Sequence, residues 1–178
     1  MIHVRPALRT SSKMVALLAI ALASWAPVVS SQTKTKPAKI KAGAFKVTMI
    51  ESNEIKLPAE FQVSLYEDLI QQLQKKSGIS KVYREGDKNA ASAADLVVLN
   101  TTVTGFKAGS ERLRQVTTVA GATSINVHCA FTDAAGKTLL EQDIKGNVRF
   151  FGANLRATYD FAKKAAQLAH ENFSTTGS

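Results

Sequence analysis

One short motif in the chain has the residue types of a phosphate-binding loop. Gly136–Thr138 reads Gly-Lys-Thr, the end of such a loop. The complete motif needs another glycine five positions earlier, where this chain has Phe131, and a helix directly after it. Alternating apolar and polar residues predict a strand over 139–151 instead. We therefore interpret Asp133–Gly136 as the turn of a β-hairpin, with glycine supplying the positive φ.

The histidines and the single cysteine do not form a recognisable reactive group. His3 lies in the first residues of the chain, and neither His128 nor His170 has a second ligand at a metal-binding spacing. His128 and Cys129 are neighbours on an expected strand, so their side chains face opposite sides and cannot pair. We expect Cys129 to be a buried, small apolar residue, and one cysteine excludes an internal disulfide. No metal ion and no cofactor is expected.

Two carboxylates on the second strand of the hairpin have a spacing that acid–base catalysis could use. Glu141 and Asp143 share one face of the expected strand, about 7 Å apart by strand geometry. Lys145 and Arg149 share that face, so a solvated face of alternating charge is the better interpretation. We expect no catalytic residues and no enzyme activity. A deep pocket that joined His128 to either carboxylate would favour an enzyme.

A polar cluster follows Gly109. It contains Ser110, Glu111, Arg112 and Arg114 in a segment without alternation, which indicates a loop. Ser110, Arg112 and Arg114 could contact an anion or a partner, because loops often carry binding residues. An ordinary exposed connection explains the same residues, and both interpretations stay open.

The spacing of apolar residues predicts a single α+β domain. The clearest element is a helix over 59–77, with Phe61 and three leucines recurring every four residues and a polar remainder that includes Gln72. A second, alanine-rich helix should run from Asn154, as its cap, to about Phe173. Strands are expected at 45–50, 79–84, 95–106, 123–132 and 139–151. We expect two layers: a mixed, mostly antiparallel sheet of about five strands with both helices on one face, in the order β-α-β-β-β-β-α.

The start of the chain has the order of a secretory signal peptide. Three basic residues precede an apolar run over 14–23, and Val29 and Ser31 put small side chains before a cut at Gln32. Ala23 offers an alternative cut. The apolar run is shorter than the ~20 residues that a membrane-spanning helix needs. We therefore expect a signal peptide (1–31), a flexible basic linker (32–42), one domain (43–173) and a disordered tail (174–178), soluble in the periplasm or secreted.

The positive charge of the chain is concentrated at its start. The formal charge is +9, yet residues 51–178 hold 15 basic and 14 acidic residues. Nucleic-acid binding depends on concentrated positive charge, so we do not expect it of this domain. The basic linker could touch an anionic surface weakly through its lysines, although a solvated linker is the simpler interpretation. Those lysines are Lys34, Lys36, Lys39 and Lys41.

The layout also resembles a known family. Val103-x-x-Phe106 leads to Gly109-x-x-Arg112, a later strand and turn read Val127-x-x-x-Phe131-x-Asp133-x-x-Gly136-Lys137, and Phe151-Gly152 precedes the alanine-rich helix. Over residues 43–173 this is similar to the bacterial domain-of-unknown-function family number 4410. The resemblance implies an exported protein of the envelope. Many relatives are lipid-anchored, but this chain has no cysteine at its cut. The family supplies no catalytic residues.

These observations favour an exported, non-enzymatic interaction or accessory module of the bacterial envelope, with envelope proteins as partners. A periplasmic domain that binds a small ligand or an anion is the alternative, and an enzyme is the third hypothesis. Stabilisation by a ligand in a thermal-shift screen would separate the binder from the interaction module.

Overall fold

The structure, a computed structural model, describes residues 38–176 except 53, 111, 114–120 and 149–152. The expected signal peptide, its cleavage site at Ser31 and Gln32, and the linker lysines Lys34 and Lys36 lie outside the described residues. Arg114 and the end of the strand expected over 139–151 lie outside them as well.

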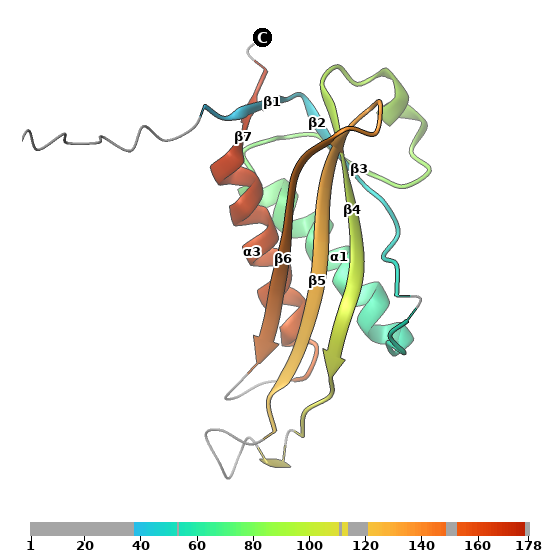
Figure 1. Ribbon diagram of the computed structural model, residues 1–178, viewed down its shortest axis with the longest axis vertical. Coiled ribbons are helices and arrows are strands. Elements are labelled where there is room, and N and C mark those ends of the chain that lie inside the picture. Colours follow the sequence, from blue (N-terminus) through green and yellow to red (C-terminus); the bar gives the residue numbers. More distant parts are fainter. Residues whose placement is uncertain (1–37, 53, 111, 114–120, 149–152, 177–178) are drawn as a thin grey trace, which may run out of the picture. The chain divides into compact units, whose positions relative to one another are not determined.

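A five-stranded sheet forms one layer of the domain (Figure 1). Its strand order is β3-β2-β4-β5-β6, with β2 parallel to both of its neighbours and β4, β5 and β6 antiparallel in succession. The mixed, mostly antiparallel α+β fold expected from the sequence is therefore confirmed. The strands are β2 (Ala44–Val47), β3 (Val82–Arg84), β4 (Leu96–Lys107), β5 (Thr123–Asp133) and β6 (Thr138–Val148).

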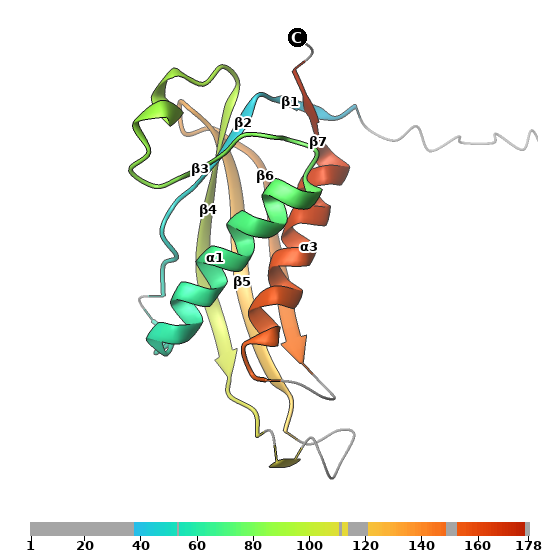
Figure 2. The same ribbon diagram turned by 180° about the vertical axis from the view of Figure 1, so that it is seen from behind.

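Two helices, α1 (Ala59–Lys76) and α3 (Arg156–Asn172), form the second layer on one face of the sheet (Figure 2). The apolar stripe of α1 is buried, and Gly78 follows its last turn with a φ of 82° that favours glycine. The buried side of α3 consists largely of alanines, which let its backbone approach the sheet closely. Outside these layers, a short 3-10 helix, η1 (Lys88–Ser92), leads into β4.

The core lies between the sheet and the helices. One face of β5 points into the core, because Ile125, Val127, Cys129 and Phe131 alternate along the strand and are all completely buried. The two layers approach each other closely at Gly146 on β6. A Cβ atom there would lie 2.2 Å from the carbonyl oxygen of Ala157 on α3, so only glycine fits.

Two expectations about the helices are wrong. Gln72, expected on the polar face of α1, is buried, and its Oε1 has no hydrogen-bond partner among the described residues. Asn154 does not cap α3, which begins after Leu155 without a side-chain cap. Its side chain instead accepts a hydrogen bond from Thr123 Oγ1 at 2.6 Å, because the loop before β5 lies against the start of α3.

The two ends of the domain pair with each other, which the sequence interpretation missed. Residues 40–42 of the expected flexible linker form β1 (Ile40–Ala42), and β7 (Phe173–Thr175) joins the expected end of the second helix to the start of the expected tail. The two strands are parallel, with Ile40 opposite Phe173. Ala42 and Phe173 are buried in the core, which explains why both segments are ordered. Among the described residues, no helix is long and apolar enough to cross a membrane.

Candidate interaction surface

Strand β6 forms one edge of the sheet over eleven residues. Ile144, Gly146 and Val148 face the core, so the odd-numbered residues from Glu141 to Asn147 lie on the outer face. In an antiparallel strand, alternate residues direct both their N–H and C=O groups away from the paired neighbour. On β6 these are the same odd-numbered residues, as the contacts of Lys145 and Asn147 with α3 demonstrate.

Helix α3 covers only part of this edge. The N–H of Asn147 donates to Asp160 Oδ2 at 3.0 Å, and Lys164 Nζ donates to the carbonyl oxygen of Lys145 at 2.7 Å. Lys164 also pairs with Asp160 at 2.7 Å, which fixes both side chains over the strand. Charged side chains placed over an edge strand reduce its pairing with other chains. Within the described part of the chain, these contacts of α3 with the strand edge end at Lys145, and Glu141, Gln142 and Asp143 are exposed.

A groove of about 470 Å³ lies beside this open stretch, between β6 and α3. Its apolar part comes from Ile144 and Leu168, and its acidic side chains are Asp143 and Glu171. The remaining lining residues are Gln142, Lys145, Lys164 and Gln167. We call the groove and the adjoining open stretch the β6–α3 groove. Its shape suits an extended segment that could add hydrogen bonds to β6.

A histidine–carboxylate pair borders the β6–α3 groove on the outer face of the sheet. The strand register puts Thr102, His128 and Asp143 in one row across three strands. His128 Nδ1 lies 2.8 Å from Asp143 Oδ1, and both side chains are open to solvent. The structure thus pairs His128 with Asp143, two of the residues whose meeting in a deep pocket would favour an enzyme. Of the two, only Asp143 lines the groove, and its side chain is 76% exposed.

Cys129 faces the opposite side of β5 from His128, as expected. Its thiol is buried among core side chains, and this burial raises its pKa to about 12. A thiol with that pKa carries almost no thiolate near neutral pH, and only the thiolate is an effective nucleophile. Cys129 therefore acts as a core residue.

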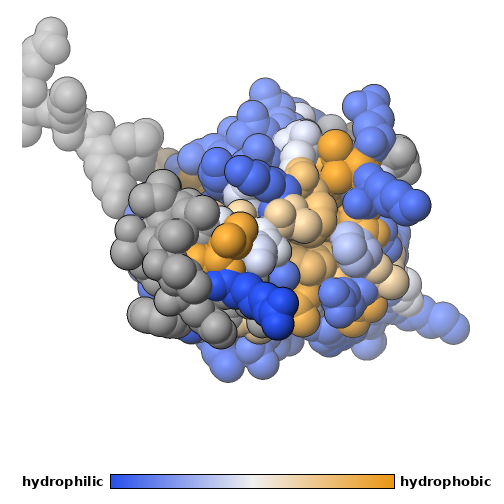
Figure 3. Space-filling view, turned by 90° about the horizontal axis from the view of Figure 1, so that it is seen from below, coloured by the Kyte–Doolittle hydropathy of each residue, from blue (hydrophilic) through white to orange (hydrophobic). Residues whose placement is uncertain are grey.

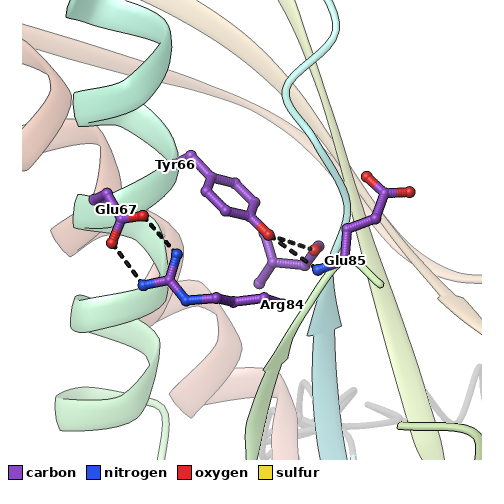
Figure 4. Close-up of polar contacts among 5 residues, drawn as sticks. Tyr66, Glu67, Arg84 and Glu85 are labelled. Atoms are coloured by element: carbon purple, nitrogen blue, oxygen red, sulfur yellow. Dashed lines mark hydrogen bonds and ion pairs between the residues drawn. The ribbon is translucent and has the colours of Figure 1, made fainter. Parts of the chain in front are cut away.

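The opposite edge of the sheet is short and fastened to α1 (Figure 4). Arg84 on β3 donates two hydrogen bonds to Glu67 at 2.5 and 2.6 Å. These bonds lower the pKa of the Glu67 carboxyl and raise that of Arg84. Tyr66 Oη accepts from the N–H of Glu85 at 3.0 Å, and the Arg84 guanidinium lies over the Tyr66 ring. These contacts hold the three-residue strand β3 against α1, so we assign them a structural role.

The expected contact loop after Gly109 is only partly described. Ser110 Oγ accepts a hydrogen bond from the N–H of Leu113, and Arg112 is exposed. The position of Gly109 is fixed from outside the loop, because its N–H donates to Thr123 Oγ1 at 3.1 Å. Ser110 thus supports the local turn. Of the residues expected to contact an anion or a partner, Arg112 is described and faces solvent.

Other expected contact residues lie apart from this loop. Lys39 Nζ donates to the carbonyl oxygen of His170, and Lys41 is exposed on β1. No group of three His, Cys, Asp or Glu side chains in the described part of the chain could hold a metal ion.

Comparisons with known proteins identify a family and a fold. The family model of a domain of unknown function, DUF4410, matches residues 28–152. No curated protein matches the chain. Two solved structures share the fold, both dodecamers of PelC from Paraburkholderia phytofirmans. A leucine-to-methionine variant has 15% identity and a TM-score of 0.55, covering 78% of this chain and 95% of PelC. The other structure has 15% identity and a TM-score of 0.52, covering 74% and 91%.

Proposed function

The chain belongs to the DUF4410 family of domains of unknown function, and from this premise we propose that it is an exported, non-enzymatic module that associates with envelope proteins, copies of itself included. The export half of the proposal rests on the amino-terminal sequence, which has the charge and hydropathy order of a signal peptide. The association half rests on the surface of the folded domain.

The observation that carries the proposal is the half-open edge of β6. An unpaired strand edge offers a row of N–H and C=O groups that another chain can bind. Here α3 covers Lys145 and Asn147 but leaves the stretch from Glu141 to Asp143 open beside a groove. Partial protection suits a specific partner, because the covered half limits how far a second strand can extend.

Self-association is supported by the fold relatives and by the two unequal edges of the sheet. Both PelC structures are dodecamers. Contacts between two different surfaces of the same protein close into rings when the rotation between copies permits it. In this chain the edges differ, since β6 has eleven residues and β3 has three. A ring of copies would join β6 of one copy to a different surface of the next, whereas two β6 edges that pair with each other form a closed dimer.

The non-enzymatic part of the proposal rests on the candidate reactive groups. His128 and Asp143 form a solvent-exposed pair, and a general base works best in a site that excludes water. Cys129 is buried with a raised pKa. An alternating face with Lys145 nearby explains the carboxylates without catalysis.

The proposal is tested by measuring the mass of the protein in solution after export and processing in a bacterial host. We expect light scattering after size-exclusion chromatography to find an oligomer. Asp143→Pro should dissociate it, because proline removes an N–H that points away from β5 and therefore leaves the sheet intact. Asp143→Ala is the matched control, since it loses the same carboxylate and the same His128 contact but keeps the N–H.

Two results would contradict the proposal. The proposed association would be wrong if the protein is a monomer at every concentration and crosslinking in cells recovers no envelope protein. Equal masses for the proline and alanine variants, with unchanged melting temperatures, would exclude β6 as the contact.

One observation favours a second candidate function, the binding of a small anion. Lys76, Lys163 and His170 line a hollow of about 210 Å³ where α1 and α3 end. Lys76 and His170 lie in the last turns of the two helices, where basic side chains also stabilise the helix dipoles, which is their simpler role. Stabilisation by phosphate or citrate in a thermal-shift assay, lost in Lys163→Glu, would support anion binding. No stabilisation by either anion would exclude it.

A further inference from the structure

One end of the domain gathers exposed apolar side chains. Both helices begin at this end, and β4 ends there (Figures 1 and 2). The ring contact between Phe61 and Phe106, at 4.9 Å, brings the first turn of α1 to the end of β4. Asn154 lies near Gly109 and Thr123, which brings in the start of α3. We call residues 54–63, 106–110, 112–113 and 153–159 the helix-start end.

Three of the four exposed large hydrophobic residues of the described chain lie at the helix-start end. Val63 is 63% exposed, Leu113 50% and Tyr159 45%. The hydrogen bond between Ser64 and Thr158, at 2.8 Å, joins the chain neighbours of Val63 and Tyr159. Ile55, Phe106 and Leu155 are half-buried around them. Figure 3 views the molecule from this end and shows hydrophobic residues gathered there, with hydrophilic residues among them.

Among the described residues of the helix-start end, exposed basic side chains outnumber exposed acidic ones. Lys56, Lys107, Arg112 and Arg156 are exposed, against Glu54 and Glu60. An apolar area with a basic rim and an exposed tyrosine has the composition of surfaces that lie on lipid headgroups. A symmetric contact with a second copy would bring two positive rims together, which disfavours it.

We propose that the helix-start end binds the surface of an anionic lipid bilayer. Val63, Leu113 and Tyr159 insert among the headgroups, while Arg112 and the neighbouring basic residues attract the lipid phosphates. This inference goes beyond the proposed function, because it uses a different surface and a partner that is not a protein. It gives the molecule a defined orientation, with β1 and β7 at the end facing away from the bilayer (Figure 1).

The test measures co-flotation of the purified, processed protein with lipid vesicles. We expect binding to vesicles of phosphatidylcholine with phosphatidylglycerol, weaker binding at high salt, and little binding to phosphatidylcholine alone. Arg112→Ala should weaken the binding about fivefold, because each basic side chain near an anionic membrane surface strengthens binding by about this factor. Leu113→Glu should weaken it further. Met49→Glu is the matched control, because Met49 is 60% exposed but lies outside the helix-start end.

Several results would overturn the inference. The proposal is contradicted if the protein does not bind the anionic vesicles, if it binds both vesicle types equally, or if Leu113→Glu and Met49→Glu lose vesicle binding to the same extent. A change of mass in Leu113→Glu without any effect on vesicle binding would assign this end to a second copy instead. Melting temperatures of all variants exclude misfolding as the cause. Asp143→Pro should leave vesicle binding unchanged, so this test and the test of self-association fail separately.

Discussion

Replacing Gly146 with alanine should destabilise the domain more than its small size suggests. Gly146 lies on β6 where α3 crosses it, and an added Cβ would be 2.2 Å from Ala157 O and 2.6 Å from Phe161 Cβ. Carbon atoms do not come that close to their neighbours, and the backbone oxygen of a helix cannot rotate aside as a side chain can. The first half of α3 must therefore retreat by about 1 Å from the sheet.

The size of the effect follows from what that retreat disturbs. Ala157 and Phe161 are completely buried, so the movement opens gaps around them as well as relieving the clash. Added atoms in a packed core cost about 1–3 kcal/mol, and contact with backbone puts this site at about 2–3 kcal/mol. In a domain of this length that corresponds to a melting temperature lower by about 6–12 °C. Urea unfolding followed by circular dichroism measures the free energy directly.

Gly105→Ala is the matched control. Gly105 lies on β4 of the same sheet, and its added Cβ would meet only the side chain of Asn126, which is exposed and can move. We expect a change within about 0.5 kcal/mol, as for most surface substitutions. If both variants unfold at the same urea concentration, the close approach of α3 to β6 described here is wrong.

Two further predictions follow from the described pKa shifts. The Cys129 thiol should not react with Ellman's reagent in the native protein at pH 8 but should react fully in urea; rapid native labelling would contradict its burial. The pKa of this thiol is about 12 in the folded protein and 9.0 in the unfolded chain. Between these two values the unfolded chain loses the proton first, so the thiol should leave the free energy of unfolding unchanged below pH 9 and should lower it as the pH rises from 9 toward 12. Arg84→Ala should reduce stability by less than about 1 kcal/mol, since the pair with Glu67 is half-exposed, and should speed hydrogen exchange on β3. The lowered pKa of Glu67 means that the wild-type advantage should be present above the ordinary pKa of 4.5 and disappear as the pH falls below it; an advantage that persists at pH 2 would contradict the assignment.

The sequence predicts the local structure of this fold well, because local structure follows from residue spacing. The four-residue repeat from Phe61 to Leu73 identified α1, and the alternation from Ile125 to Phe131 identified the buried face of β5. The hairpin turn was also predicted correctly. Gly136 has a φ of 86°, and Asp133 Oδ1 accepts hydrogen bonds from the N–H groups of Ala135 and Lys137.

The errors arise where distant segments meet. Ile40–Ala42 has the composition of a linker and becomes a strand only because Phe173–Thr175 lies beside it. Asn154 has the residue type of a helix cap, but Thr123 offers its side chain another partner. The sequence does contain one indication of the pairing between these two segments, because Ala42 and Phe173 are apolar residues in polar surroundings.

The candidate surface was only partly predictable for the same reason. The alternation placed His128 and Asp143 on the outer face, but their pairing depends on the register of the hairpin. That register shifts between Phe131 and Thr132, which residue types do not reveal. Tyr159 is exposed, because the buried face of α3 consists of its alanines together with Thr158 and Phe161.

The pairing of β1 with β7 has a consequence for the order in which the protein is completed. Lys39 and His170, which contact each other beside this pair, are 131 positions apart in the sequence. Closing a loop of that length carries a large entropic penalty, about 4 kcal/mol by the logarithmic rule, so the pair should form after the local helices and the hairpin. Its last strand is also the last described part of the chain to be synthesised. The domain therefore cannot complete its core until almost the whole chain has been synthesised.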